Sequence, residues 1–143
     1  MTEGEAALAA RVFGTALDVA RVRVLATPFP RAFVPGRWFG VDWICWPRAT
    51  LSHDLSASPL SVRATFVHEL VHVWQAQAGT NLLFAKLRAG DGPQAYAYVP
   101  VPDCVWDGLN IEQQAMVVEH RYRLEEGGTV PADRAFYDRV CPF

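Results

Sequence analysis

The sequence predicts an α+β fold in which a small sheet packs against two long helices. Two β-rich stretches, "ARVRVLA" from Ala20 and "WFGVDWICW" from Trp38, indicate the strands of the sheet. Apolar residues recur at helical spacing in "LSVRATFVHELVHVWQAQAG", which ends at Gly79, and in "NIEQQAMVVEHRYRLEEGG", which starts at Asn110. We expect residues 1–143 to form a single domain, because a chain of 143 residues accommodates one core and no flexible linker divides it.

Shorter elements are predicted around these four. Helical spacing from about Glu3 to Gly14 predicts a first helix, and "NLLFAKLRAG" predicts a short one. The proline-rich "PFPRAFVPGR" is expected to be a loop and "QAYAYVPVP" an extended segment. A last short helix is expected from about Ala132 to Val140.

Composition excludes several classes of function. The formal net charge of −2 gives no electrostatic basis for binding nucleic acid or an anionic membrane, and no apolar run reaches the length of a membrane span. The acidic start "MTEGEAALAARVFG" lacks the basic flank of a secretory signal, so we expect a cytoplasmic protein or one exported by a signal-independent secretion system. Three scattered cysteines predict reduced thiols rather than a disulfide framework.

The strongest motif is His68-Glu69-Leu70-Val71-His72, in the first long helix. Side chains four residues apart lie on one face of a helix, so both imidazoles can bind one tetrahedral zinc ion. The glutamate after the first histidine points to the side, where it reaches metal-bound water rather than the metal. The alternative is that His68 and His72 are hydrogen-bonded core residues, but two of four histidines in this pattern favour a metal site.

Two histidines need a third ligand, since a catalytic zinc site has three protein ligands and water. No further histidine follows at the spacing of the three-histidine zinc motif, because Gln75 and Ala78 stand where glycine and histidine are required. Glu112 and Glu119 lie two turns apart on one face of the second long helix, so either carboxylate is a candidate. Glu112 is preferred; Glu119 is the substitute, a hydrogen-bond acceptor for a histidine N–H, or a solvated charge.

"FVHELVHVWQAQAG" followed by "NIEQQAMVVEHRYRL" resembles small bacterial zincin-like proteins related to the type VI secretion spike (Vgr) protein. The opening "LAARVFGTALDVARVRV" is similar to the same group, so the resemblance covers most of residues 8–124. It implies a zincin-like minimal metallopeptidase fold and a gluzincin-type HExxH site. It also implies His68, His72 and Glu112 as ligands of one Zn²⁺ and Glu69 as general base.

Two functions remain open. The first is a zinc-dependent metallopeptidase that hydrolyses a peptide or protein substrate through metal-bound water, with Glu69 as base. Candidate donors to the oxyanion are Tyr96, Tyr98, His120 and Tyr122, although ordinary packing also explains such residues. The second is a catalytically silent accessory or binding module, associated with a secretion spike, in which zinc is structural. We favour the enzyme because a structural site has no need of Glu69 and usually has four protein ligands.

Overall fold

The computed structural model describes all 143 residues and has an α+β architecture with one three-stranded sheet and six helices. The strands are β1 (Val22–Thr27), β2 (Phe33–Trp38) and β3 (Val41–Pro47). The helices are α1 (Glu3–Phe13), α2 (Leu60–Gln77), α3 (Leu82–Ala89), α4 (Pro93–Tyr96), α5 (Ile111–Glu125) and α6 (Arg134–Val140). The predicted class, a small sheet with two long helices, is confirmed.

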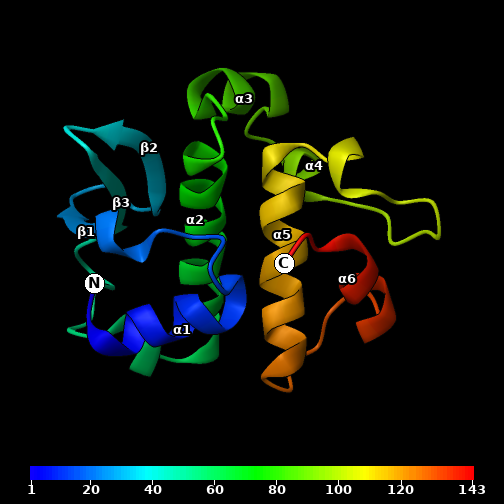
Figure 1. The fold of residues 1–143 in the computed structure, drawn as a ribbon, viewed down its shortest axis with the longest axis horizontal. Helices are drawn as coiled ribbons and strands as arrows, with labels where there is room; N and C mark the ends of the chain where they lie inside the picture. Colours follow the sequence, from blue (N-terminus) through cyan, green and yellow to red (C-terminus); the bar gives the residue numbers. More distant parts are fainter.

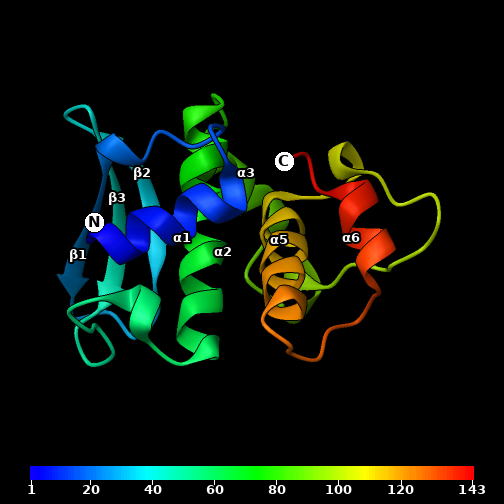
Figure 2. The ribbon, with the colours of Figure 1, turned by 60° about the horizontal axis from the view of Figure 1, so that its bottom comes forward.

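Helix α2 lies at the centre of the molecule. The sheet covers one side of it and α5 runs along the other, with α6 outside α5 (Figure 1). Helix α1 runs crosswise to α2 and passes in front of it in Figure 2. Because α2 is buried from two sides, its residues from Phe66 to Val73 are all buried, which explains why its sequence is apolar almost all round.

The sheet has the order β1-β3-β2, with β1 parallel and β2 antiparallel to β3. Strand β3 is central and mostly buried, and it packs against α2. Strand β2 is an edge strand and faces α2 and α3.

The loop predicted for "PFPRAFVPGR" is wrong in its second half, where β2 begins at Phe33. Pro35 and Gly36 lie within this strand, at an irregularity in its pairing with β3. Proline lacks an N–H group, but an edge strand leaves one side unpaired and tolerates the loss. An edge strand can therefore contain proline and glycine, and these residues made its sequence look like a loop.

The predicted long helices are confirmed with small shifts at their ends. Asn110 caps α5 through a capping box with Gln113, as its position before the helix predicted. In α2 the cap position is taken by Pro59, without a side-chain hydrogen bond. The segment "QAYAYVPVP", predicted to be extended, begins inside the short helix α4. None of the helices combines the length and the apolar character that crossing a lipid bilayer requires.

Candidate metal centre

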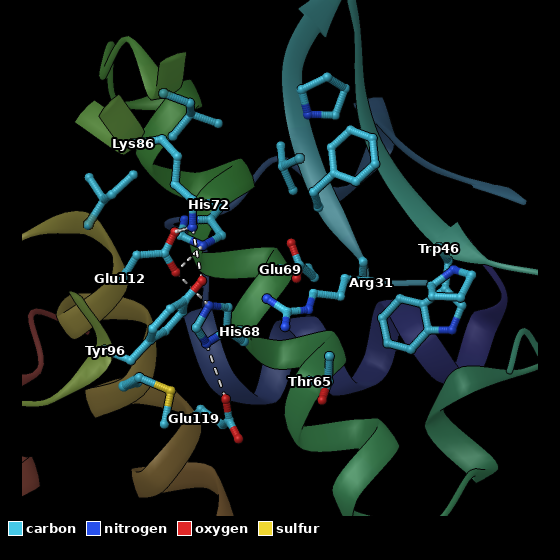
Figure 3. A pocket seen from close by; sticks show the side chains of 18 of the residues that line it. Arg31, Trp46, Thr65, His68, Glu69, His72, Lys86, Tyr96, Glu112 and Glu119 are labelled. Atoms are coloured by element: carbon cyan, nitrogen blue, oxygen red, sulfur yellow. Dashed lines mark hydrogen bonds and ion pairs between the residues drawn. The ribbon is translucent and has the colours of Figure 1, made fainter. Parts of the chain in front are cut away.

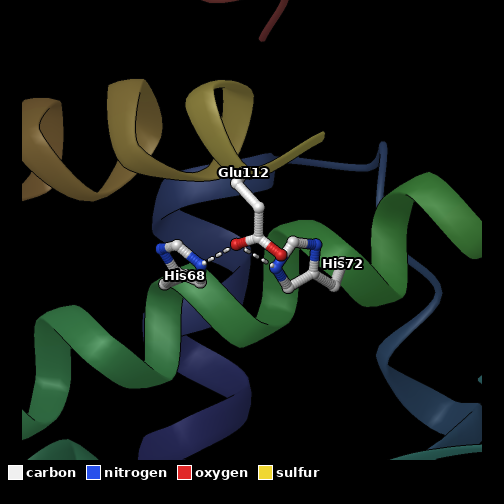
Figure 4. A group of neighbouring side chains, drawn as sticks. All are labelled: His68, His72 and Glu112. Carbon is white, nitrogen blue, oxygen red and sulfur yellow. Dashed lines mark hydrogen bonds and ion pairs between the residues drawn. The ribbon is translucent and has the colours of Figure 1, made fainter. Parts of the chain in front are cut away.

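Two helices bring the predicted ligands together. His68 and His72 lie one turn apart on α2, and Glu112 lies in the first turn of α5, which packs along α2 (Figure 4). One ligand atom from each residue lies within 4.8 Å of the other two, and all three side chains are buried. The structure therefore brings together the residues that we expected to bind zinc.

The two histidines both approach one carboxylate oxygen of Glu112. Glu112 Oε2 lies 3.2 Å from His68 Nε2 and 3.4 Å from His72 Nε2. Two imidazole nitrogens and one carboxylate oxygen are a donor set that suits zinc, and the three donors leave a fourth coordination position open.

A second set of contacts fixes the far side of each imidazole. His68 Nδ1 lies 3.1 Å from Glu119 Oε2, and His72 Nδ1 lies 2.8 Å from Gln75 Oε1. When Nδ1 donates to such an acceptor, the lone pair of Nε2 is available to a metal ion. Glu119 is thus placed as a hydrogen-bond acceptor for His68 rather than beside the Nε2 atoms, which is one of the three roles that the sequence left open.

The remaining oxygen of Glu112 is held by Lys86 from α3. Lys86 Nζ donates to Glu112 Oε1 at 2.6 Å and to the Tyr96 hydroxyl at 2.9 Å (Figure 3). The ion pair occupies Oε1 and leaves Oε2 facing the histidines. The sequence offered no signal for Lys86, whereas Gln75, three residues after His72 on the same helix, could have been found by spacing.

The cluster is arranged to hold positive charge. Burial opposes protonation of His68, but hydrogen bonds with Glu112 and Glu119 outweigh it and raise the pKa of His68 to about 9. Burial likewise opposes ionisation of Glu112, but both histidines and Lys86 hold its pKa far below the ordinary value. Two ionised carboxylates around His68 call for a cation, either a proton or a metal ion. A divalent metal held by these donors would take the place of that proton.

Glu69 is buried beside these donors, at 6% exposure. Its Oε2 atom has no hydrogen-bond partner, which is unusual for a buried carboxylate oxygen. Burial raises the pKa of Glu69, although His72 and His68 act in the opposite direction. An unpartnered carboxylate with a raised pKa is well suited to accept a proton from water at the site.

The cluster opens into a cavity of about 760 Å³. Its walls come from β2 with the preceding loop, from α2, from the start of α3 and from the first half of α5 (Figure 3). Arg31 and Trp46 border it on the sheet side, and Tyr96 on the side of α5. A cavity of this size beside the donors leaves room for a ligand much larger than water.

Of the four candidate oxyanion donors, only Tyr96 lines this cavity. The Tyr98 hydroxyl lies 2.7 Å from His120 Nδ1 and 2.9 Å from the Tyr137 hydroxyl, in a smaller apolar cluster between α5 and α6. Tyr122 is 1% exposed and packs under Arg11. Tyr98 and His120 are therefore hydrogen-bonded away from the cavity, and Tyr122 lies in the main core.

Comparison with known proteins identifies one relative by sequence. The chain is 33% identical, over a 153-residue alignment, to the type VI secretion system spike protein VgrG2b of Pseudomonas aeruginosa. The alignment covers 95% of this chain but 14% of the spike protein. No family model matches the sequence.

The solved structures give a corresponding result. The effector domain of Pseudomonas aeruginosa VgrG2b matches with a TM-score of 0.72 at 28% identity. The match covers 96% of this chain and 78% of that domain. This chain is similar to one domain of a spike protein. The comparisons therefore support the predicted association with a secretion spike protein.

Proposed function

We propose that this chain is a zinc-dependent metallopeptidase, in which His68, His72 and Glu112 bind one zinc ion and Glu69 is the general base. The observation that carries the proposal is the buried, unpartnered Oε2 of Glu69 beside three converging metal donors. A donor set of three with an open position is typical of catalytic rather than structural zinc.

His68, His72 and Glu112 would hold the zinc ion, which would supply a Lewis acid and lower the pKa of water at the site to about 7. Glu69 accepts a proton from the attacking water and then donates it to the nitrogen of the leaving amine. The Tyr96 hydroxyl accepts a hydrogen bond from Lys86, so its own hydrogen is free to point at the carbonyl oxygen of the substrate.

The second candidate function is a secretion-associated module without catalysis, in which zinc is structural. It is favoured by the similarity to a spike protein and to its effector domain, because that similarity concerns a secretion system rather than a reaction. Export by a secretion system is compatible with either function, since an enzyme can also be exported by such a system. We propose that the chain acts as a type VI secretion component and is exported by that route, and co-purification with a spike protein of the same organism tests this.

The experiment that separates catalysis from structural zinc compares the wild type with Glu69→Gln and Glu112→Ala. Zinc content and hydrolysis of a panel of peptides and unfolded proteins are measured for each. Glu69→Gln should retain zinc and lose about 10²–10⁴-fold in rate, the usual contribution of a general base. Glu112→Ala should lose zinc. The exposed Asp103→Asn serves as a control and should change neither property.

Two outcomes would contradict the peptidase. Zinc without hydrolysis of any substrate by the wild type contradicts the peptidase and leaves the structural-zinc module. A wild-type protein that contains no zinc, after purification without chelator, contradicts both functions.

A further inference from the structure

Helix α3 carries a stripe of exposed apolar side chains. Leu83, Phe84 and Leu87 are 69%, 69% and 71% exposed. Their spacing of three and four residues places them on one side of the helix. Nothing else in the chain covers this stripe, and large apolar groups clustered on a surface are typical of binding sites.

The opposite side of α3 is tied to the metal centre. Leu82 is buried at 9% exposure, and Lys86 holds both Glu112 and Tyr96. Asn81 caps the helix by accepting from the Phe84 backbone N–H. These contacts hold α3 in place beside Glu112 and Tyr96, so they also set the position of the stripe relative to the metal donors.

The stripe continues into the cavity. Leu83 belongs to both, because it is exposed on α3 and lines the cavity beside Leu82. On the sheet side the cavity is bordered by Phe33, which is 38% exposed. The Phe33 ring packs edge-on against the ring of the exposed Phe29, and the two ring centroids are 5.6 Å apart. Figure 3 shows the two sides, with Lys86 of α3 on one and the β2 side chains on the other. Exposed apolar groups therefore border the cavity on both sides.

We propose that this surface, formed by the α3 stripe, Phe29 and Phe33, binds an extended polypeptide segment that carries large apolar side chains. The inference rests on the proposed function and names its substrate class. The stripe runs about 6 Å along the helix axis from Leu83 to Leu87, and Phe84 and Leu87 lie outside the cavity, so a ligand that covers the stripe and also reaches the metal donors must be extended. The preferred substrates are thus polypeptides with accessible apolar segments, and peptides of two or three residues are poor ones.

Binding is tested with zinc-loaded protein carrying Glu69→Gln, so that the probe is not cleaved. The probe is a fluorescein-labelled 14-residue peptide in which Leu and Phe alternate with Ser, followed by fluorescence anisotropy. The test variant adds Phe84→Gln and Leu87→Gln, because glutamine keeps the helix while removing the apolar surface. The matched control adds Val99→Gln and Val105→Gln, which are 69% and 60% exposed and do not line the cavity.

The α3 variant should bind the probe at least about tenfold more weakly, and the control within about twofold of the parent. In the active background, kcat/KM for the long peptide should fall relative to that for a tripeptide. Equal losses in the two variants, or none in the α3 variant, overturn the inference. Concentration-dependent dimerisation that Phe84→Gln with Leu87→Gln abolishes also overturns it, because the stripe then binds a second copy of the chain.

The two proposals fail in different ways. If the probe binds through α3 but no substrate is hydrolysed, the peptidase is contradicted and the binding surface stands. If short peptides are hydrolysed and the probe does not bind, the surface is contradicted and the peptidase stands.

Discussion

At His68 the two ring nitrogens face different carboxylates. Nε2 lies beside Glu112 and Nδ1 beside Glu119, on opposite sides of the ring. The two glutamates, which spacing alone made equivalent, therefore have separate roles in the structure. Glu112 approaches both histidines, whereas Glu119 orients one of them and is itself held by Arg123 at 2.8 Å.

This division predicts different effects of the two glutamates on metal binding. Glu119→Gln should weaken zinc binding by about 10–100-fold, the usual effect of losing a partner of a ligating histidine. Glu112→Ala should weaken it further, because a ligand is removed. Competition with a chromophoric chelator measures both constants. If the loss in Glu119→Gln equals or exceeds that in Glu112→Ala, Glu119 is the ligand instead.

At the scale of elements, the site depends on how closely α2 and α5 approach. Ala115, with 0% exposure, lies on the buried face of α5, where a small side chain permits this approach. Gln75 of α2 donates to the Ile111 carbonyl at 3.1 Å and to Gln114 at 2.8 Å, next to Glu112. The residue that orients His72 thus also fixes the start of the helix that supplies the carboxylate.

The other end of this helix pair is joined by an ion-pair cluster. Glu126, which follows α5, accepts from Arg63 of α2 at 2.7 Å and pairs with Arg11 of α1 at 2.8 Å. Burial acts to raise the pKa of Glu126, but the hydrogen bonds from the two arginines outweigh it and lower the pKa below its ordinary value. The cluster therefore connects three helices through one ionised carboxylate.

Its contribution to stability should depend on pH. A carboxylate whose pKa is lower in the folded state stabilises above its unfolded pKa, and the effect is lost as pH falls through the folded pKa. Glu126→Gln should therefore cost about 0.5–1 kcal/mol in the free energy of unfolding at pH 7 and progressively less below about pH 4.5. Urea unfolding at several pH values measures this. If the loss of stability does not shrink in acid, or if Asp103→Asn causes the same loss, the ion pairs of Glu126 do not stabilise the fold as predicted.

At the scale of the whole molecule, the candidate metal centre joins segments that are distant in sequence. His68 and His72 come from the central helix and Glu112 from a helix on its outer side, so an ion shared by them links α2 to α5. A ligand that binds the folded state alone stabilises it by mass action.

Removing zinc should consequently lower the melting temperature. At a free zinc concentration of about 100 times the dissociation constant, the gain is about 2.7 kcal/mol, or roughly 5–10 °C for a domain of this size. Thermal unfolding with zinc and with a chelator measures the difference. Glu112→Ala is the control and should show almost no difference. Equal melting temperatures in zinc-containing wild type would contradict a metal shared by the two helices.

Much of the site was predictable because its signals are local. His68, Glu69 and His72 lie within two turns of one helix, and helical periodicity sets their relative directions wherever the helix packs. Asn110 marks the start of α5 through its own side chain, which placed Glu112 in the first turn. The class of fold followed from similar local patterns. Metal binding itself, and the use of Glu69, stay predictions.

The tertiary structure alone decided which carboxylate meets Nε2 and which meets Nδ1, because that depends on the angle and distance between two helices. It also decided the contact of Lys86 with Glu112, since α3 is folded over the site by a turn that no periodicity specifies. Strand β2 was hidden for the same reason, because its proline is tolerated only at an edge that the assembled sheet creates. The sequence by itself determined the chemical groups and their order along each helix, whereas packing between elements determined which of those groups meet.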